Sequence, residues 1–430
     1  MGTAATDTIV GRGTNEGGRL IRAWFEQLSD TAERGGDAAY VFVMGSMAEV
    51  LRAFDLPVVF PEINSLQTAV RRVAHDYLGA AEDYGYSPDV CGYVKADVAV
   101  QLRGGTHPMG RIPRPTLAVL TTACSTYIKW AEIWERMHGT RVFTLDVPSS
   151  RHAHHHSRPG DPDFESDRRY VEHQIRELIG LCERITATRF DLDRLREVLR
   201  LTNEMIRGWR RLLELNRARP APFNALLEGT IYLGVLNALR GTPEGSAYFR
   251  DLIEETEYKV ARGIGALPDE RYRLFFVGVP CYPIFRRFYE LFAEWGGNFV
   301  SSSYLWFASG GLDLGVEYDL DRPIESLAEG VLQSVRHAVD SMMFQDRALV
   351  AAVDDYALDG IVYHPVKSCR TVSTGLADGR IALMRARGDV MTLYLESDMM
   401  DRRVVSEAQL KNRVDAFFEG LASRKLRAMG

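Results

Sequence analysis

The 430-residue chain is poor in cysteine and has no long apolar run, and each shortage excludes a class of protein. Five cysteines are too few for a disulfide scaffold, and their odd number leaves one unpaired, which is typical of the reducing cytoplasm. No run of about 18 apolar residues exists, so we expect no membrane-spanning helix. The first residues, "MGTAATDTIVGRGTNEGG", contain no apolar core of a secretory signal.

A basic excess and a phosphate-binding loop are also missing. The net charge of −6 argues against nucleic acid as a partner, because nucleic-acid-binding proteins usually carry an excess of basic residues. The glycine-rich segment "GRGTNEGG" at 11–18 follows no expected strand and lacks the Lys-Ser/Thr pair of a nucleotide-binding loop. We therefore expect a cytoplasmic protein that binds neither nucleic acid nor membrane and has no ATP site of its own.

The pattern of apolar residues predicts an α/β fold. Single hydrophobic cores stop growing near ~250–300 residues, so a chain of this length is expected to form two or three domains. Short apolar runs alternate with amphipathic stretches over residues 1–160 and again over 269–430, which is typical of parallel sheets covered by helices. Residues 161–268 have an almost entirely helical pattern. We predict two doubly wound, flavodoxin-like parallel-sheet domains with a helical segment between them, and we find no sequence repeat of fixed period.

Several predictions concern single elements. Ser46 is expected to cap a helix, with Glu49 in the capping-box position three residues later. The apolar periodicity favours one uninterrupted helix over 64–84 and another over 326–356. The segment 298–307 is expected to be a strand.

Three cysteines follow apolar runs that lie far apart in the sequence. They stand in "SPDVCGYVKAD" (Cys91), "LAVLTTACSTYIKW" (Cys124) and "DGIVYHPVKSC" (Cys369). Each is expected at a strand end or before a helix, where open α/β sheets bind ligands. One interpretation is that they are buried thiols. The other is that three thiolates bind one iron–sulfur cluster, which usually takes four cysteines, so that one iron stays open.

The other two cysteines and several polar residues are weaker candidates. Cys182 lies in a helical pattern and is expected in the core, whereas Cys281 follows a strand and is a weaker candidate ligand. Glu62 follows a short strand, where it either transfers a proton or stabilises a helix N-terminus. His364 either faces the same cleft as the third cysteine, where it is a candidate catalytic residue, or is a hydrogen-bonded histidine at a strand end. The histidine run at 152–156 lies in a Gly/Pro-rich loop and has the composition of a metal-binding tract.

Four segments resemble the benzoyl-CoA reductase / 2-hydroxyacyl-CoA dehydratase family, in particular its cluster-binding reductase subunits. They are "EDYGYSPDVCGYVKADVAV", "LTTACSTYIKW", "LDVPSSR" and the C-terminal stretch that begins "VYHPVKSCRTVSTGLADGR". The resemblance extends over residues 38–420, although the loop 149–164 has no counterpart in it. It implies a [4Fe-4S] cluster in a cleft between two α/β domains.

The resemblance also implies which residues and partners take part. It assigns Cys91, Cys124 and Cys369 as ligands of the cluster, and it places Glu62 and Ser46 near the substrate. The implied partners are an acyl-CoA substrate, a homologous cluster-binding subunit and a separate ATP-hydrolysing electron activator with its own cluster. The missing phosphate loop agrees with a separate activator.

The leading hypothesis is an iron–sulfur subunit of an ATP-dependent aryl-CoA reductase, in which the cluster delivers single electrons at low potential to the thioester. Lys95 and Lys129 each lie one helical turn after a cysteine, where they either stabilise the cluster or the CoA phosphates or are surface lysines. Three alternatives stay open. The chain is a subunit of a 2-hydroxyacyl-CoA dehydratase, which is a lyase; it is a non-catalytic electron-relay or scaffold subunit; or it is a cofactor-free α/β protein with buried thiols.

Overall fold

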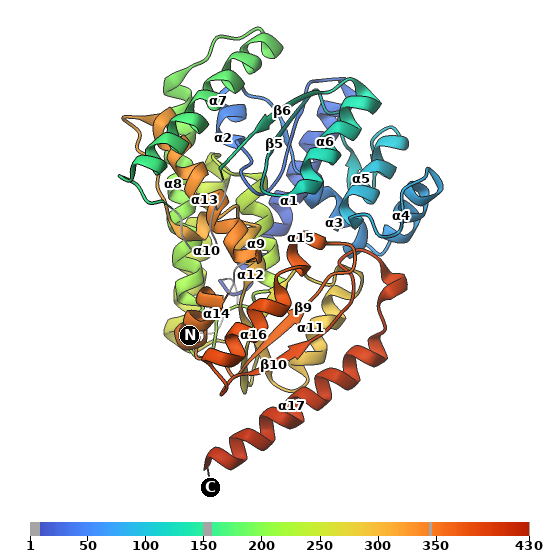
Figure 1. Ribbon diagram of the computed structural model, residues 1–430, viewed down its shortest axis with the longest axis vertical. Helices are drawn as coiled ribbons and strands as arrows, with labels where there is room; N and C mark the ends of the chain where they lie inside the picture. Colours follow the sequence, from blue (N-terminus) through green and yellow to red (C-terminus); the bar gives the residue numbers. More distant parts are fainter. Residues whose placement is uncertain (1–8, 149–156, 344–345, 430) are drawn as a thin grey trace, which may run out of the picture.

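The computed structural model describes residues 9–148, 157–343 and 346–429, and it contains two four-stranded parallel sheets with helices around them (Figure 1). In Figure 1, β5 and β6 lie in the upper half of the molecule and β9 and β10 in the lower half, with α3 and α15 near the junction. The prediction of an α/β fold with two parallel-sheet units is confirmed. The domain limits at residues 160 and 268 stay predictions.

The N-terminal sheet has the strand order β2-β1-β5-β6. Its strands are β1 (Ala39–Val41), β2 (Val58–Val59), β5 (Leu117–Thr121) and β6 (Arg141–Leu145). The connecting elements are α2 (Ala48–Ala53), α3 (Pro61–Val70), α4 (Ala74–Asp83), α5 (Gly92–Leu102), the hairpin strands β3 (Thr106–His107) and β4 (Gly110–Arg111), and α6 (Ser125–His138). The strands β1, β2 and β5 are buried along their whole length, which explains their continuous apolar runs.

The C-terminal sheet has the strand order β10-β9-β7-β8. Its strands are β7 (Tyr272–Gly278), β8 (Gly297–Ser302), β9 (Gly360–His364) and β10 (Met391–Tyr394). Its helices are η1 (Tyr282–Ile284), α11 (Phe285–Ala293), α12 (Ser303–Phe307), η2 (Leu312–Leu314), α14 (Asp346–Asp355), α15 (Arg370–Ser373), α16 (Leu376–Ala386), η3 (Arg402–Val404) and α17 (Glu407–Met429). When the strands of each sheet are numbered in chain order, both sheets have the spatial order 2-1-3-4. This is the start of the flavodoxin-like order, in which the switch point lies between the first and third strands.

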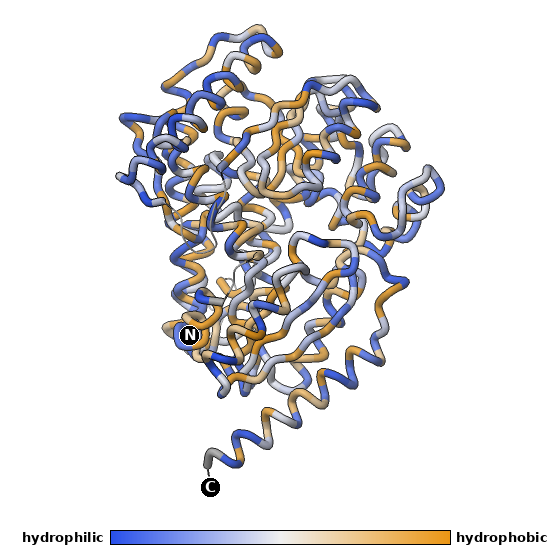
Figure 2. Tube along the Cα trace, viewed as in Figure 1, coloured by the Kyte–Doolittle hydropathy of each residue, from blue (hydrophilic) through white to orange (hydrophobic). Residues whose placement is uncertain are grey.

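A layer of long helices packs beside the two sheets. It contains α1 (Arg12–Glu33), α7 (Pro162–Thr186), α8 (Leu192–Leu215), α9 (Leu227–Ala238), α10 (Pro243–Arg262) and α13 (Pro323–Met343). Helix α1 packs against α9 and α10, although it stands first in the sequence. Figure 2 shows apolar residues gathered on the central strands and alternating with polar residues along the outer helices. None of the helices in the described ranges is both long and apolar enough to cross a membrane.

The glycine-rich segment at 11–18 lies within the first turns of α1, where it allows close helix packing. A Cβ atom on Gly13 would lie 2.4 Å from Leu252 of α10, and one on Gly17 would lie 2.8 Å from Ile231 of α9. Both distances are shorter than real carbon contacts, so a larger residue at either position would force the neighbouring side chains to shift.

Several predictions about single elements are wrong. The expected helix over 64–84 is two helices, because Arg72 adopts a left-handed conformation with φ 63° and breaks it. The strand expected over 298–307 ends at Ser302, whose Oγ accepts a hydrogen bond from the Tyr304 N–H and so begins α12. The helix expected over 326–356 is divided into α13 and α14.

The predicted capping box at Ser46 is also wrong. The N-cap of α2 is Met47, in a left-handed conformation and without a side-chain cap. Glu49 is buried and bonds to Arg240, beyond the end of α9, instead of the start of its own helix. A long-range ion pair therefore replaces the local cap.

Candidate functional site

A cavity of about 280 Å³ lies where the carboxyl ends of the two sheets meet. Val43 and Met44 follow β1, and Val279 follows β7; all three line this cavity. Cys124 follows β5, and Cys369 follows β9. In both units the cavity is therefore lined by the residues that follow the first and third strands, which flank the switch point where open α/β sheets bind ligands.

The three predicted cysteines all line this cavity, and each begins a helix. Cys91 is the N-cap of α5, Cys124 of α6 and Cys369 of α15. All three are half-buried free thiols. The Cys124 Sγ and Thr371 Oγ1 atoms are 3.3 Å apart and join the N-terminal and C-terminal units. The backbone N–H groups at a helix start favour a negative charge on the residue before it.

Two of the three thiols have raised pKa values. Burial raises the pKa of Cys91 well above its usual range, and the neighbouring Cys369 and Cys124 thiols raise it further. Burial also raises the pKa of Cys369 to about 12, with a further contribution from Cys124. Free thiolates in this cavity would therefore repel one another, whereas iron would offset their charges.

The chemistry of the donor set is that of soft, thiolate-binding metal centres. Among the described residues, no three His, Cys, Asp or Glu side chains are grouped so as to hold one metal ion. In a cubane each cysteine binds a different iron, so the sulfur atoms need to surround the cluster without meeting at one point. Three soft thiols at three helix starts line one cavity, and thiolates are the donors that iron–sulfur clusters use.

Glu62 lies in the first turn of α3 and lines the same cavity. Its Oε2 accepts a hydrogen bond from the Val43 N–H at 2.8 Å, and its Oε1 accepts one from the Tyr127 hydroxyl at 2.7 Å. Burial raises the pKa of Glu62 to about 7, although these two hydrogen bonds act in the opposite direction. This carboxyl group can therefore hold or release a proton near neutral pH.

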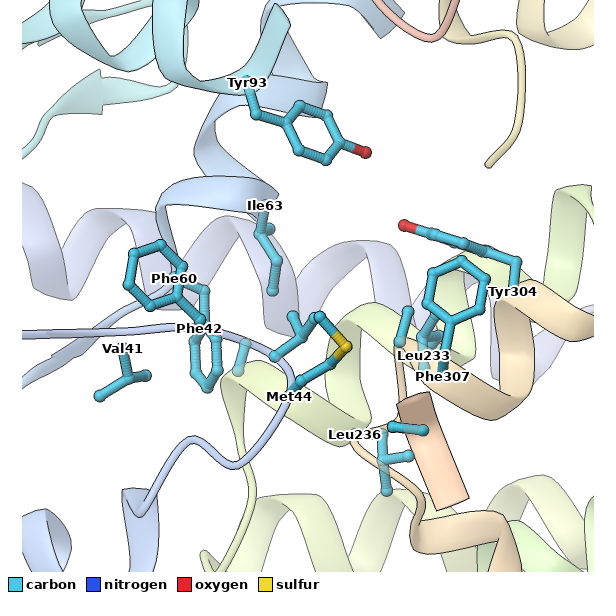
Figure 3. Packing of buried hydrophobic residues seen from close by; sticks show 14 of the residues in the cluster. Val41, Phe42, Met44, Phe60, Ile63, Tyr93, Leu233, Leu236, Tyr304 and Phe307 are labelled. Atoms are coloured by element: carbon cyan, nitrogen blue, oxygen red, sulfur yellow. The ribbon is translucent and has the colours of Figure 1, made fainter. Parts of the chain in front are cut away.

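A group of tyrosines that the sequence analysis did not single out lies beside Glu62. Tyr93 of α5 and Tyr304 of α12 line the cavity, and the Tyr282 hydroxyl donates to the Tyr304 hydroxyl at 2.7 Å. Figure 3 shows the hydroxyl groups of Tyr93 and Tyr304 pointing toward one another. The Tyr93 side chain is 8% exposed, and its hydroxyl lies within the electrostatic reach of the Tyr282 and Tyr304 hydroxyls. No local motif marks this group, because its members come from segments about 200 residues apart in the chain.

The structure places Ser46 and His364 outside the cavity lining. Ser46 is buried, and its Oγ accepts a long hydrogen bond of 3.4 Å from the Ala48 N–H. His364 is fully buried, with its ring nitrogens 2.6 Å from the Val279 carbonyl and 2.6 Å from the Ser397 hydroxyl. Burial lowers the pKa of His364 to about 4, so the ring is neutral and joins β9 to its neighbours. Their catalytic roles stay predictions that this geometry does not support.

The other cysteines and the histidine run lie elsewhere. Cys182 is buried in α7, as predicted, and Cys281 is buried at the start of η1 without lining the cavity. The histidine run at 152–156 lies outside the described residues.

The two lysines near the cysteines have different surroundings. Lys95 is buried and donates to Glu82 at 2.9 Å and to the Pro88 carbonyl at 2.7 Å. Glu82 also pairs with Arg403 of η3, so this network connects the two α/β units beside Cys91. Lys129 is exposed and pairs with Glu132 on its own helix, which makes it a surface lysine.

The fold and cavity define a two-sheet α/β protein with three thiols at the starts of helices that face one cleft. The chain belongs to the 2-hydroxyglutaryl-CoA dehydratase, D-component family, whose model matches residues 45–421. It is 30% identical over 415 residues to one of the subunits of benzoyl-CoA reductase from Thauera aromatica, covering 93% of this chain and 92% of that protein. It is 25% identical over 382 residues to the (R)-phenyllactyl-CoA dehydratase alpha subunit of Clostridium sporogenes, covering 88% of each. The predicted family resemblance is confirmed.

Proposed function

We propose that the chain is the iron–sulfur subunit of an ATP-dependent aryl-CoA reductase of the cytoplasm. The observation that carries this proposal is the meeting of Cys91, Cys124, Cys369 and Glu62 in one cavity between two sheets. The similarity to the benzoyl-CoA reductase of Thauera aromatica supports the reductase over a dehydratase, because the match to the dehydratase subunits is weaker.

The three cysteines would hold a [4Fe-4S] cluster, which supplies single electrons at low potential when bound. The helix starts of α5, α6 and α15 direct backbone N–H groups toward this position and favour its negative charge. The apolar cavity wall, with Met44 and Phe307, excludes water from the thioester. An exclusion of water also protects reactive states from side reactions.

Glu62 is the proton donor in this proposal. A reduction that adds two electrons to an aromatic ring also needs two protons, and a neutral carboxyl in the cavity can deliver one of them. The hydrogen bonds from Val43 and Tyr127 hold the carboxyl in a fixed orientation. Its raised pKa keeps a large share of Glu62 protonated at neutral pH.

Tyr93 orients the substrate in this proposal. Tyr93 lines the cavity, and its hydroxyl would donate a hydrogen bond to the thioester carbonyl oxygen, where negative charge develops. We expect Tyr93→Phe to lower kcat/KM about 10- to 100-fold, in the range for one hydrogen bond to a charged group. The iron content should not change. Steady-state kinetics would check this, with Tyr84→Phe, an exposed tyrosine, as the matched control.

The partners follow from the same proposal. The relatives are named as subunits, and a homologous cluster-binding subunit would complete the enzyme. An ATP-hydrolysing activator with its own cluster would deliver the electrons.

Product analysis of the anaerobic complex tests the reaction. The chain, co-purified with its partner subunit, would receive ATP, activator, a low-potential reductant and either benzoyl-CoA or (R)-phenyllactyl-CoA. A reductase converts benzoyl-CoA to a product with two more hydrogens and consumes two electrons for each molecule. A dehydratase instead removes water from (R)-phenyllactyl-CoA with no net consumption of electrons. Conversion of neither thioester would contradict both activities.

A further inference from the structure

The cavity has a cationic end away from the three cysteines. We propose that Arg22 and Arg71 at this end bind the phosphate groups of a coenzyme A thioester, so that the acyl end of the same molecule reaches Glu62 and the cysteines. The inference rests on the proposed function, because it takes the CoA thioester from there. It assigns a phosphate site and fixes the direction in which the substrate lies.

Helix α3 sets the distance between the two ends. Glu62 stands in its first turn and Arg71 directly after its last residue, and both line the cavity. Nine residue steps separate them, which corresponds to roughly 13.5 Å along the helix axis at 1.5 Å per residue. Leu66, Gln67 and Val70 of the same helix line the cavity between them. The cavity is therefore a channel along α3 and not a pocket around the cysteines alone.

Helix α1, which carries Arg22, and helix α3, which ends directly before Arg71, both contact the buried ring of His107. Arg22 is one turn before Phe25 on α1, and Phe25 stacks on His107 with ring centroids 5.4 Å apart. Burial and, to a smaller extent, the charge of Arg71 lower the pKa of His107 to about 4. The segments that carry Arg22 and Arg71 therefore meet at this ring, and both arginines line the cavity.

The two guanidinium groups are free to bind an anion. Many exposed arginines of this chain pair with carboxylates, such as Arg19 with Glu16. Neither Arg22 nor Arg71 forms an ion pair with any carboxylate in the described part of the chain. Arginine is suited to phosphate because its planar fork donates two hydrogen bonds at once.

The wall between the ends suits an uncharged, amide-containing arm. Gly18 of α1 and Gly234 of α9 line this part of the cavity together with the apolar side chains of Ile21 and Ile231. The Thr230 hydroxyl faces this part of the cavity and has no hydrogen-bond partner among the described residues. An amide of the pantetheine arm would supply that partner.

A third cavity arginine, Arg370, does not fit the phosphate role. It follows Cys369 directly, so it lies at the end of the cavity that holds the thiols. A thioester with its phosphates there would have to fold back on itself to bring its acyl group to Glu62.

Comparing a CoA thioester with its pantetheine analogue tests the inference. The pantetheine thioester carries the same acyl group and lacks the phosphates and the nucleotide. For the anaerobic complex with Arg22→Ala and Arg71→Ala combined, we expect KM for benzoyl-CoA to rise about 30-fold or more, and KM for benzoyl-pantetheine to stay unchanged. Arg72→Ala is the matched control, because Arg72 is an exposed neighbour that does not line the cavity.

Calorimetric binding of free CoA gives a second readout that needs no turnover. The inference predicts that the wild-type complex binds CoA and that the double variant binds it at least tenfold more weakly. Equal effects on both thioesters, an effect confined to Arg370→Ala, or unchanged CoA binding in the double variant would each overturn it. Arginine-dependent CoA binding without any turnover would leave the phosphate site in place and contradict the proposed function instead.

Discussion

Glu62→Gln is expected to lower kcat of the anaerobic complex by roughly 100- to 10,000-fold, the range for loss of a positioned proton donor. Glutamine keeps the size of the side chain, and its one oxygen can still accept the bond from the Val43 N–H, while its NH2 group would face the Tyr127 oxygen; it cannot release a proton. Turnover of benzoyl-CoA, measured beside iron content, checks this result. Iron should stay at the wild-type level, because Glu62 is not expected to bind the cluster.

The raised pKa of Glu62 also predicts the direction in which kcat/KM changes with pH. The raised pKa of Glu62, about 7, means that its protonated form dominates below that pH. The wild-type kcat/KM should therefore fall as pH rises above about 7, and the Gln variant should lack this decline. Ionising the buried carboxyl also costs stability, since its folded pKa lies above its unfolded value of 4.5. The free energy of unfolding of wild type relative to the variant should thus decrease between pH 5 and pH 8.

Glu132→Gln on the exposed face of α6 is the control for the first prediction. It should retain wild-type turnover. If Glu62→Gln also turned over at the wild-type rate, the catalytic assignment would be incorrect, and a subunit that only relays electrons to its partner would fit better.

Arg240→Ala is expected to lower the free energy of unfolding by about 3–5 kcal/mol, because it leaves a buried carboxylate without its cation. The Glu49 and Arg240 side chains are only 1% and 5% exposed, and the Arg240 Nε lies 2.5 Å from the Glu49 Oε1. Arg240 also donates to the Tyr318 hydroxyl at 3.1 Å. The pair joins α2, beside the N-terminal sheet, to the helical layer. Denaturant unfolding of the purified protein measures the loss.

The double variant Glu49→Leu with Arg240→Met is the control for that measurement. Replacing both charges with apolar groups removes the unpaired carboxylate, so this variant should recover most of the lost stability. An equal loss in the single and double variants would show that the effect comes from packing and not from the ion pair.

The positions of the three cysteines could be predicted from the sequence, because local signals determine them. Each follows a short apolar run or a turn and precedes an amphipathic stretch, and the structure places Cys91, Cys124 and Cys369 at helix N-caps as expected. The alternation of strands and helices was equally visible, since continuous apolar runs are typical of buried parallel strands.

Long-range packing determines the features that the sequence did not reveal. Tyr93 lies near Tyr304 only because α5 of the N-terminal unit and α12 of the C-terminal unit line the same cavity. Glu49 pairs with Arg240, 191 residues away, and no local pattern indicates such a partner. The equal strand order of the two sheets is likewise a property of pairing, because the two halves share no repeat in sequence. The break at Arg72 lacks the glycine or proline that would have signalled it.

Iron and acid-labile sulfide per chain, measured on anaerobically purified protein, test the central claim most directly. Wild type should contain about four of each, as a cubane requires. Cys91→Ser should lose them, and Cys182→Ser, which changes a buried thiol of α7 that does not line the cavity, should not. Wild-type protein without iron under strict exclusion of oxygen would contradict the account and leave the three cysteines as structural thiols.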